Sequence, residues 1–103
     1  MVFIEATLFT KRVKDYLSDE QYTAMQNLLI QDPAAGDLIP GTGGLRKIRW
    51  GSKGKGKRGG VRIIYYRQKA EDQIYLLTIY AKNEMSDLSA SNKKALKQMV
   101  EEW

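Results

Sequence analysis

The stretch Gly41–Arg67, GTGGLRKIRWGSKGKGKRGGVRIIYYR, decides the fold of this chain. Within it, Leu45–Trp50 alternates in polarity, and Val61–Arg67 is rich in the β-branched and aromatic residues that favour strands. The segment Gly51–Gly60, rich in glycine and lysine, joins the two. Two strand patterns joined through glycine indicate a β-hairpin. We therefore expect the middle of the chain to form an antiparallel pair of strands.

Upstream of this hairpin, the sequence predicts one strand and two helices. Val2–Ala6 has the composition of a short strand. A first helix, which Thr7 could cap, is indicated by apolar residues at helical spacing: Phe9, Val13, Tyr16 and Leu17. Ser18 followed by Gln21 has the form of a capping box and predicts the start of a second helix. Asp32-Pro33 should end that helix, because the residue before proline disfavours helical backbone.

Downstream, one more strand and one more helix are expected. Ile74–Ala81 is nearly all apolar, which is typical of a central strand covered on both faces. Ser89 or Ser91 can begin a last helix with an apolar inner side made of Ala95, Leu96, Met99, Val100 and Trp103. The predicted order is β-α-α-β-β-β-α. This is an α+β fold in which a small, mainly antiparallel sheet carries an N-terminal helical hairpin and a C-terminal helix. At 103 residues, we expect one domain spanning positions 1–103.

The positive charge of the chain is concentrated in and around the hairpin. Of 17 basic residues, ten lie in Leu38–Ala70, a window without any acidic residue. The remaining seven basic and all 12 acidic residues lie outside it, so the window carries +10 and the rest −5. Such a separation predicts one cationic surface, and a phosphate backbone is the partner best suited to it.

The residues missing from the chain exclude several kinds of site. It has no cysteine and no histidine, which excludes disulfides, thiolate metal sites and the usual general base near neutral pH. We expect no metal site and no cofactor. The start of the chain does not have the pattern of a signal peptide, and no apolar run approaches the roughly 20 residues of a membrane span. A cytoplasmic protein without membrane contact is expected.

Gly51–Lys57 nearly matches the G-x-x-x-x-G-K pattern of a nucleotide-binding loop, but Arg58 follows it where a serine or threonine should supply a magnesium ligand. Because the next element is a strand, no helix N-terminus would face the phosphates. The segment is better interpreted as part of a nucleic-acid surface, or as a solvated loop.

The candidate residues of this surface combine cations with aromatic side chains on which unstacked bases could rest. For the aromatic residues, Tyr65 included, core packing is the alternative. The residues expected to contact RNA or the ribosome are Arg46, Lys53, Lys55, Lys57, Arg58, Arg67, Trp50 and Tyr66.

Three cations have the arrangement that phosphoryl transfer without a metal would need. Alternation places Lys47 and Arg49 on one face of their strand, and Arg62 lies on the next strand of the hairpin. If the register brings them together, fixed positive groups could stabilise the charge that grows on a phosphate in the transition state. The alternative is that all three are solvated charges at a sheet edge.

Three blocks, GTGGLRKIRW, GKGKRGGVRIIYY and YLLTIYAKNE, resemble the HigB/RelE superfamily of toxins from bacterial type II toxin–antitoxin modules. The resemblance covers nearly the whole chain and is strongest to the phage-associated HigB-like branch. It implies an mRNA endonuclease acting in the ribosomal A site. In that reaction the RNA 2′-hydroxyl attacks the neighbouring phosphate without a metal. It also implies that a cognate antitoxin protein silences the toxin.

The resemblance further implies roles for individual residues. The family's strand lysines correspond to Lys47 and Arg49, its following arginine to Arg62, and its later basic residue to a position near Lys82 or Asn83. The family's late tyrosine has no match, since Leu88 or a neighbour occupies that region, and the histidines of some HigB proteins are absent.

The acid and the base are therefore not given by the resemblance. Glu84 or a lysine crowded by other cations is a candidate base. Arg62 would bind the scissile phosphate, and Lys47 or Lys57 could protonate the departing 5′-oxygen. For Glu84 the alternatives are a salt bridge to Lys82 or a contact at a helix start.

Two other functions fit the same fold. One is a toxin like the ParE group, which poisons DNA gyrase without the full set of basic catalytic residues. The other is a basic RNA- or DNA-binding module without enzymatic activity. We expect the antitoxin to cover Lys47–Arg62 or to hold the last helix in an inactive position.

Overall fold

The computed structural model describes residues 1–51 and 60–103. In this part of the chain the elements are β1 (Val2–Glu5), α1 (Thr7–Tyr16), α2 (Asp19–Gln31), β2 (Asp37–Leu38), β3 (Leu45–Trp50), β4 (Val61–Gln68), β5 (Gln73–Ala81) and α3 (Ala90–Glu101). The predicted α+β class and element order are confirmed. The two-residue strand β2, which the sequence did not indicate, is the one addition in the described residues.

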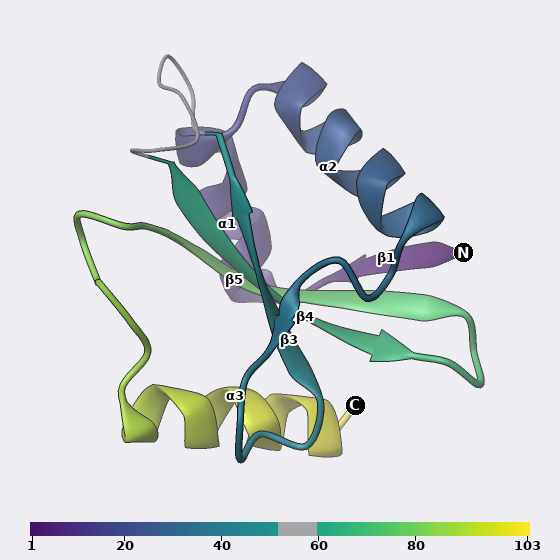
Figure 1. Ribbon diagram of the computed structural model, residues 1–103, viewed down its shortest axis with the longest axis vertical. Helices are drawn as coiled ribbons and strands as arrows, with labels where there is room; N and C mark the ends of the chain where they lie inside the picture. Colours follow the sequence, from purple (N-terminus) through teal and green to yellow (C-terminus); the bar gives the residue numbers. More distant parts are fainter. Residues whose placement is uncertain (52–59) are drawn as a thin grey trace.

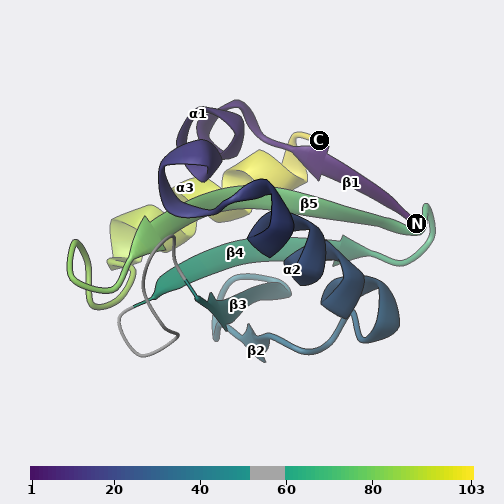
Figure 2. The same cartoon turned by 90° about the horizontal axis from the view of Figure 1, so that it is seen from above.

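The strands form one sheet with the order β1-β5-β4-β3-β2. β1 runs parallel to β5, while the other three pairings are antiparallel. Helices α1 and α2 cover one face of the sheet and α3 covers the other (Figures 1 and 2). No helix in the described ranges is long and apolar enough to span a bilayer.

Local hydrogen bonds explain where the helices begin. The Ser18 side chain accepts from the backbone N–H of Gln21, whose side chain accepts from the backbone N–H of Ser18, so the predicted capping box is confirmed. Ser89 forms the same arrangement with Asn92 at the start of α3. The prediction that Thr7 caps α1 is wrong. Ala6 occupies the N-cap position without a side-chain bond, and Thr7 is already helical.

Strand β5 separates two hydrophobic clusters, because seven consecutive residues, Ile74–Tyr80, are buried. On the α1/α2 face, Phe9, Met25 and Leu29 are fully buried against the sheet. The smaller cluster on the α3 face includes Leu96. There, Trp103 stacks on Tyr75 with ring centroids 4.0 Å apart. Met99 and Val100 also pack against this cluster, so the expected inner side of the last helix is confirmed except for Ala95, which is exposed.

A β-bulge in β5 changes which residues share a face. Ile64 pairs with Thr78, but the next residue of β4, Tyr65, pairs with Leu76, so Leu77 is an extra residue. Regular alternation would put Tyr75 and Tyr80 on opposite faces of the sheet. The extra residue puts both in the cluster on the α3 face.

The loop after α2 is fastened to the sheet by one tyrosine. The Tyr65 side chain is fully buried, donates a hydrogen bond to the carbonyl of Pro33 at 2.8 Å and accepts one from the N–H of Gly36 at 2.9 Å. A Cβ atom on Gly36 would lie 2.8 Å from the Tyr65 ring, so only glycine fits this approach. Of the two interpretations of Tyr65, the structure supports core packing.

We expect Tyr65→Phe to lower the free energy of unfolding by about 1–3 kcal/mol, because it leaves a buried N–H and a partly buried carbonyl without their partner. Urea denaturation measures this difference. Tyr66→Phe is the matched control, since the neighbouring ring is only partly buried. Equal stability of Tyr65→Phe and the parent would show that the two hydrogen bonds of the Tyr65 hydroxyl do not stabilise the fold.

Candidate functional site

Three polar residues lie in one row across three neighbouring strands. Arg49 of β3 pairs directly with Arg62 of β4, and Arg62 pairs on its other side with Tyr80 of β5. Directly paired residues project from the same face of a sheet. Lys47 lies two residues before Arg49, opposite Ile64, and so projects from this face as well. The register therefore brings the three predicted cations to one face, the face that α3 covers in part.

Arg62 is unusual among these cations because it is buried, with an exposed fraction of 7%. Its guanidinium donates only to the carbonyl of Val61, at 3.4 Å, and in the described residues no carboxylate lies within salt-bridge distance. Burying a guanidinium without an anionic partner costs free energy. An anionic ligand at this position would offset that cost.

Lys47 is engaged by a carboxylate that the sequence analysis did not consider. Its Nζ atom lies 3.5 Å from Oδ1 of Asp87, in the segment that joins β5 to α3. The backbone N–H of Leu88 and the positive charge of Lys47 lower the pKa of Asp87. Asp87 therefore stays ionised and adds a negative charge beside the cationic row.

Tyr80, the second residue that sequence reasoning missed, completes the row. Its side chain is 1% exposed, and its hydroxyl is buried without a hydrogen-bond partner among the described residues. Burial raises its pKa, Asp87 raises it further, and Arg62 opposes the increase. No sequence signal was available for it, because regular alternation along the strand does not reveal the bulge.

Glu84 lies in a different network. Its carboxylate accepts hydrogen bonds from the hydroxyl of Tyr16 and from the backbone N–H of Ala81, and it lies 3.8 Å from the guanidinium of Arg12. The bond from Tyr16 is the main cause that lowers the pKa of Glu84. A lowered pKa makes a carboxylate a weaker base, and this one is held toward α1 rather than toward Lys47 and Arg62. Neither expected alternative, a bond to Lys82 or a contact at a helix start, is formed.

The residues expected to contact RNA are not all on the same face. Trp50 packs against the α1/α2 cluster and donates from its indole N–H to the carbonyl of Gln21 at 3.1 Å. Arg46 donates to the carbonyls of Ala34 and Gly36, which anchors the loop after α2. Both side chains thus have structural partners on the opposite side of the sheet from Arg62.

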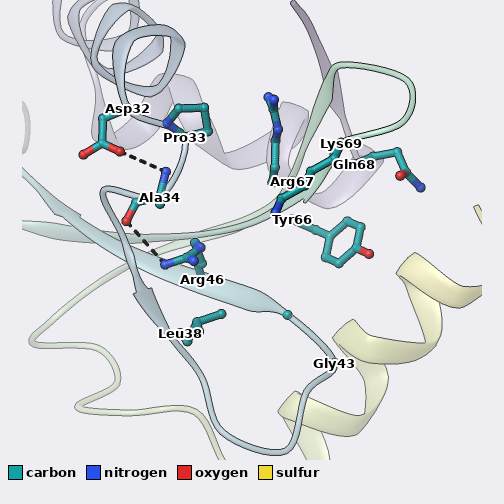
Figure 3. Close-up of a pocket in the computed structure, with 11 residues that line it drawn as sticks. Asp32, Pro33, Ala34, Leu38, Gly43, Arg46, Tyr66, Arg67, Gln68 and Lys69 are labelled. Atoms are coloured by element: carbon teal, nitrogen blue, oxygen red, sulfur yellow. Dashed lines mark hydrogen bonds between the residues drawn. The ribbon is translucent and has the colours of Figure 1, made fainter.

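Arg46, Tyr66 and Arg67 line a cavity of about 550 Å³ (Figure 3). Arg67 is paired with Asp72 at 3.2 Å, and the Tyr66 ring belongs to the cluster under α3. Along β4, Arg67 lies five residues from Arg62, a distance of roughly 16 Å. This cavity is therefore separate from the row.

Of the remaining predicted residues, only Lys82 is among those that the structure describes. Lys82 follows β5 directly and is exposed, while its backbone N–H bonds the carbonyl of Gly60 at 3.2 Å. Lys53, Lys55, Lys57 and Arg58 lie outside the described residues. Within residues 1–51 and 60–103, no group of three or more acidic side chains could hold a metal ion.

Residues 2–103 match the family described as the RelE toxin of the RelE/RelB toxin–antitoxin system. This chain belongs to the RelE toxin family. Membership makes it a toxin of a toxin–antitoxin system and implies a cognate antitoxin as its partner. The resemblance at the level of RelE is thereby confirmed.

Solved structures support the fold of this RelE-family toxin. The isolated RelE toxin of E. coli is 14% identical with a TM-score of 0.60, over 95% of this chain and 97% of that one. A double mutant of E. coli RelE in the free state is 11% identical with a TM-score of 0.60, over 82% and 86%. A conserved hypothetical protein from Helicobacter pylori is 19% identical with a TM-score of 0.52, over 82% and 98%.

We expect Glu84→Gln to reduce stability at neutral pH by less than about 1 kcal/mol, because the carboxylate is half exposed and solvent screens its ion pair. The folded protein lowers the pKa of Glu84, so its contribution is present above the unfolded pKa and is lost as the pH falls through the folded value. The difference between variant and parent should therefore shrink in acid.

Thermal or urea unfolding at several pH values between about 3 and 7 measures this effect across the carboxyl titration range. Glu71→Gln, an exposed position in the turn after β4, is the control. A difference that grows in acid would contradict the assigned network.

Proposed function

We propose that this toxin is a ribosome-dependent mRNA endonuclease that cleaves RNA in the A site by attack of a 2′-hydroxyl on the neighbouring phosphate, without a metal. The observation that carries the proposal is the row in which Arg49 pairs with Arg62, with Lys47 two residues away on the same face. A toxin that only occupies a protein partner would not need a buried arginine without a carboxylate.

The reaction requires charge stabilisation and proton transfer. The 2′-hydroxyl gives its proton to a base, which a lysine crowded by other cations would supply, as its oxygen bonds to phosphorus and the 5′-oxygen departs. Negative charge then grows on the non-bridging oxygens. Arg62, fixed in the middle of the sheet, would bind these oxygens, and Arg49, which is exposed, would bind the adjoining backbone. Lys47 is suited to protonate the departing 5′-oxygen, because an ammonium group can give up a proton and a guanidinium does not.

The ribosome and the antitoxin complete the proposed setting. The ribosome would hold the mRNA in place, which lowers the entropy cost of aligning the 2′-hydroxyl with the phosphate. The antitoxin would silence the toxin by covering Lys47–Arg62 or by fixing α3. We place the activity in the cytoplasm, where ribosomes and mRNA meet. We also propose that the chain belongs to the phage-associated HigB-like branch, which the sequence blocks quoted above resemble.

Cleavage of mRNA on programmed ribosomes tests the proposal. We expect Arg62→Met to lower the cleavage rate about 10²- to 10³-fold, since it removes one fixed donor to the developing charge. Methionine keeps the apolar stem that packs in the sheet. Lys47→Met should lower the rate about 10²- to 10⁴-fold through loss of the proton donor. Mapped mRNA ends and single-turnover rates provide the measurement.

Lys69→Met is the matched control, because it removes one charge from the same basic window at an exposed position after β4. A folded Arg62→Met variant that cleaves like the parent would refute the site. Inhibition of gyrase without cleavage would instead favour the ParE-like function. RNA binding without either effect would indicate a simple binding module.

A further inference from the structure

We propose that Arg62 and Tyr80 act as one buried pair that binds a single RNA phosphate. In the absence of RNA, the carboxylate of Asp87 is the anion beside this site, and it competes with the phosphate. The inference rests on the proposed function and assigns Tyr80 a direct contact with the substrate. It also gives a reason for the buried Tyr80 hydroxyl, which has no hydrogen-bond partner among the described residues, to lie beside a buried arginine.

The first argument is position. Tyr80 is the direct cross-strand partner of Arg62, so the two side chains leave the same face of adjacent strands. The positive charge of Arg62 opposes the rise in the pKa of Tyr80, as expected for a cation on the neighbouring strand. The two side chains nevertheless form no hydrogen bond with each other in the described structure, although the phenolic oxygen of Tyr80 could accept one from the guanidinium.

The second argument is unused hydrogen-bonding capacity. A buried hydroxyl without a partner is costly, and native proteins rarely keep one without a reason. The guanidinium of Arg62 has five N–H groups, and in residues 1–51 and 60–103 its one hydrogen-bond acceptor is the carbonyl of Val61, at 3.4 Å. A phosphate offers several acceptor oxygens, so a single phosphodiester can satisfy both residues. Burial raises the pKa of Tyr80, so its hydroxyl remains protonated and able to donate.

The third argument is the nearby carboxylate. Asp87 acts electrostatically on the Tyr80 hydroxyl and pairs with Lys47, so its negative charge lies between β3 and β5 beside the row. Its side chain is 65% exposed and therefore has room to move. It precedes Leu88, which packs in the cluster that contains Tyr80. An arriving phosphate would replace Asp87 as the anion facing Lys47 and gain access to Arg62 and Tyr80.

The experiment compares three variants with the parent. Tyr80→Phe removes only the hydroxyl. Tyr75→Phe is the matched control, because Tyr75 is a buried tyrosine on the same strand and face, and its hydroxyl bonds Gln73. Asp87→Asn removes the negative charge that competes with the phosphate. The probe is a short single-stranded RNA with 2′-O-methyl groups, which cannot be cleaved by this route. Its affinity is measured at low salt by fluorescence anisotropy, and the cleavage rate is measured separately on programmed ribosomes.

We expect Tyr80→Phe to bind the probe about 10-fold more weakly and to cleave at least about 10-fold more slowly, as for a lost hydrogen bond to a charged group. Its thermal stability should equal or exceed that of the parent, because an unpartnered hydroxyl is removed. Asp87→Asn should bind the probe more tightly, by up to about 10-fold, since a competing anion is neutralised. Tyr75→Phe should bind and cleave like the parent.

The two assays separate this inference from the proposed function. If the parent cleaves and a folded Tyr80→Phe variant cleaves and binds equally well, the inference is wrong while the endonuclease proposal stands. If the parent does not cleave, the endonuclease proposal fails, and the probe affinities of Tyr80→Phe and Asp87→Asn still decide whether the pair binds phosphate. Equal affinities in all variants would overturn the inference.

Discussion

The pairing of β4 with both of its neighbours is the constraint on which the rest of this structure depends. Because β4 lies between β3 and β5, its register fixes which side chains meet across three strands. Arg62 is thereby placed between Arg49 and Tyr80. If β4 slipped by one residue relative to its neighbours, its side chains would change faces. Arg62 would then be a buried charge against the α1/α2 cluster. Fold and candidate site are therefore specified by the same hydrogen bonds.

Much of this arrangement could be predicted from the sequence, because it depends on short-range patterns. Alternation in Leu45–Trp50 correctly separated the face of Lys47 and Arg49 from that of Trp50. The capping box at Ser18 and the apolar run of β5 were equally local signals. These signals succeed because each describes the physics of a few adjacent residues.

The features that could not be predicted all depend on contacts between distant segments. The bulge at Leu77 changes which side chains of β5 project from each face of the sheet, and no residue type at that position indicates a bulge. The attachment of Glu84 to Tyr16 joins positions 68 residues apart in the chain. The pairing of Lys47 with Asp87 likewise depends on how the segment before α3 returns to β3. The sequence identifies the charged residues, but it does not show which of them are already paired with another side chain and which are free to bind a ligand.

Chemically similar residues consequently serve different purposes on the two faces of the sheet. On one face, Arg46 holds the loop after α2 through carbonyl groups, and Trp50 packs against α2. On the other face, the guanidinium of Arg62 makes one hydrogen bond within the described part of the chain, to the carbonyl of Val61. Both arginines lie within one basic window of the sequence, so charge density alone overstates how much of that window is available to RNA. Burial and bonding partners make the distinction.

The burial of Arg62 and Tyr80 has a consequence for how this protein can change over generations. On the proposed function, both positions weaken the folded state of the free molecule in exchange for affinity toward a substrate. Apolar replacements there would raise the stability of the fold and lower the toxicity in the same step. Mutants that escape the toxin through these codons would therefore keep a stable fold and lose activity, rather than unfold.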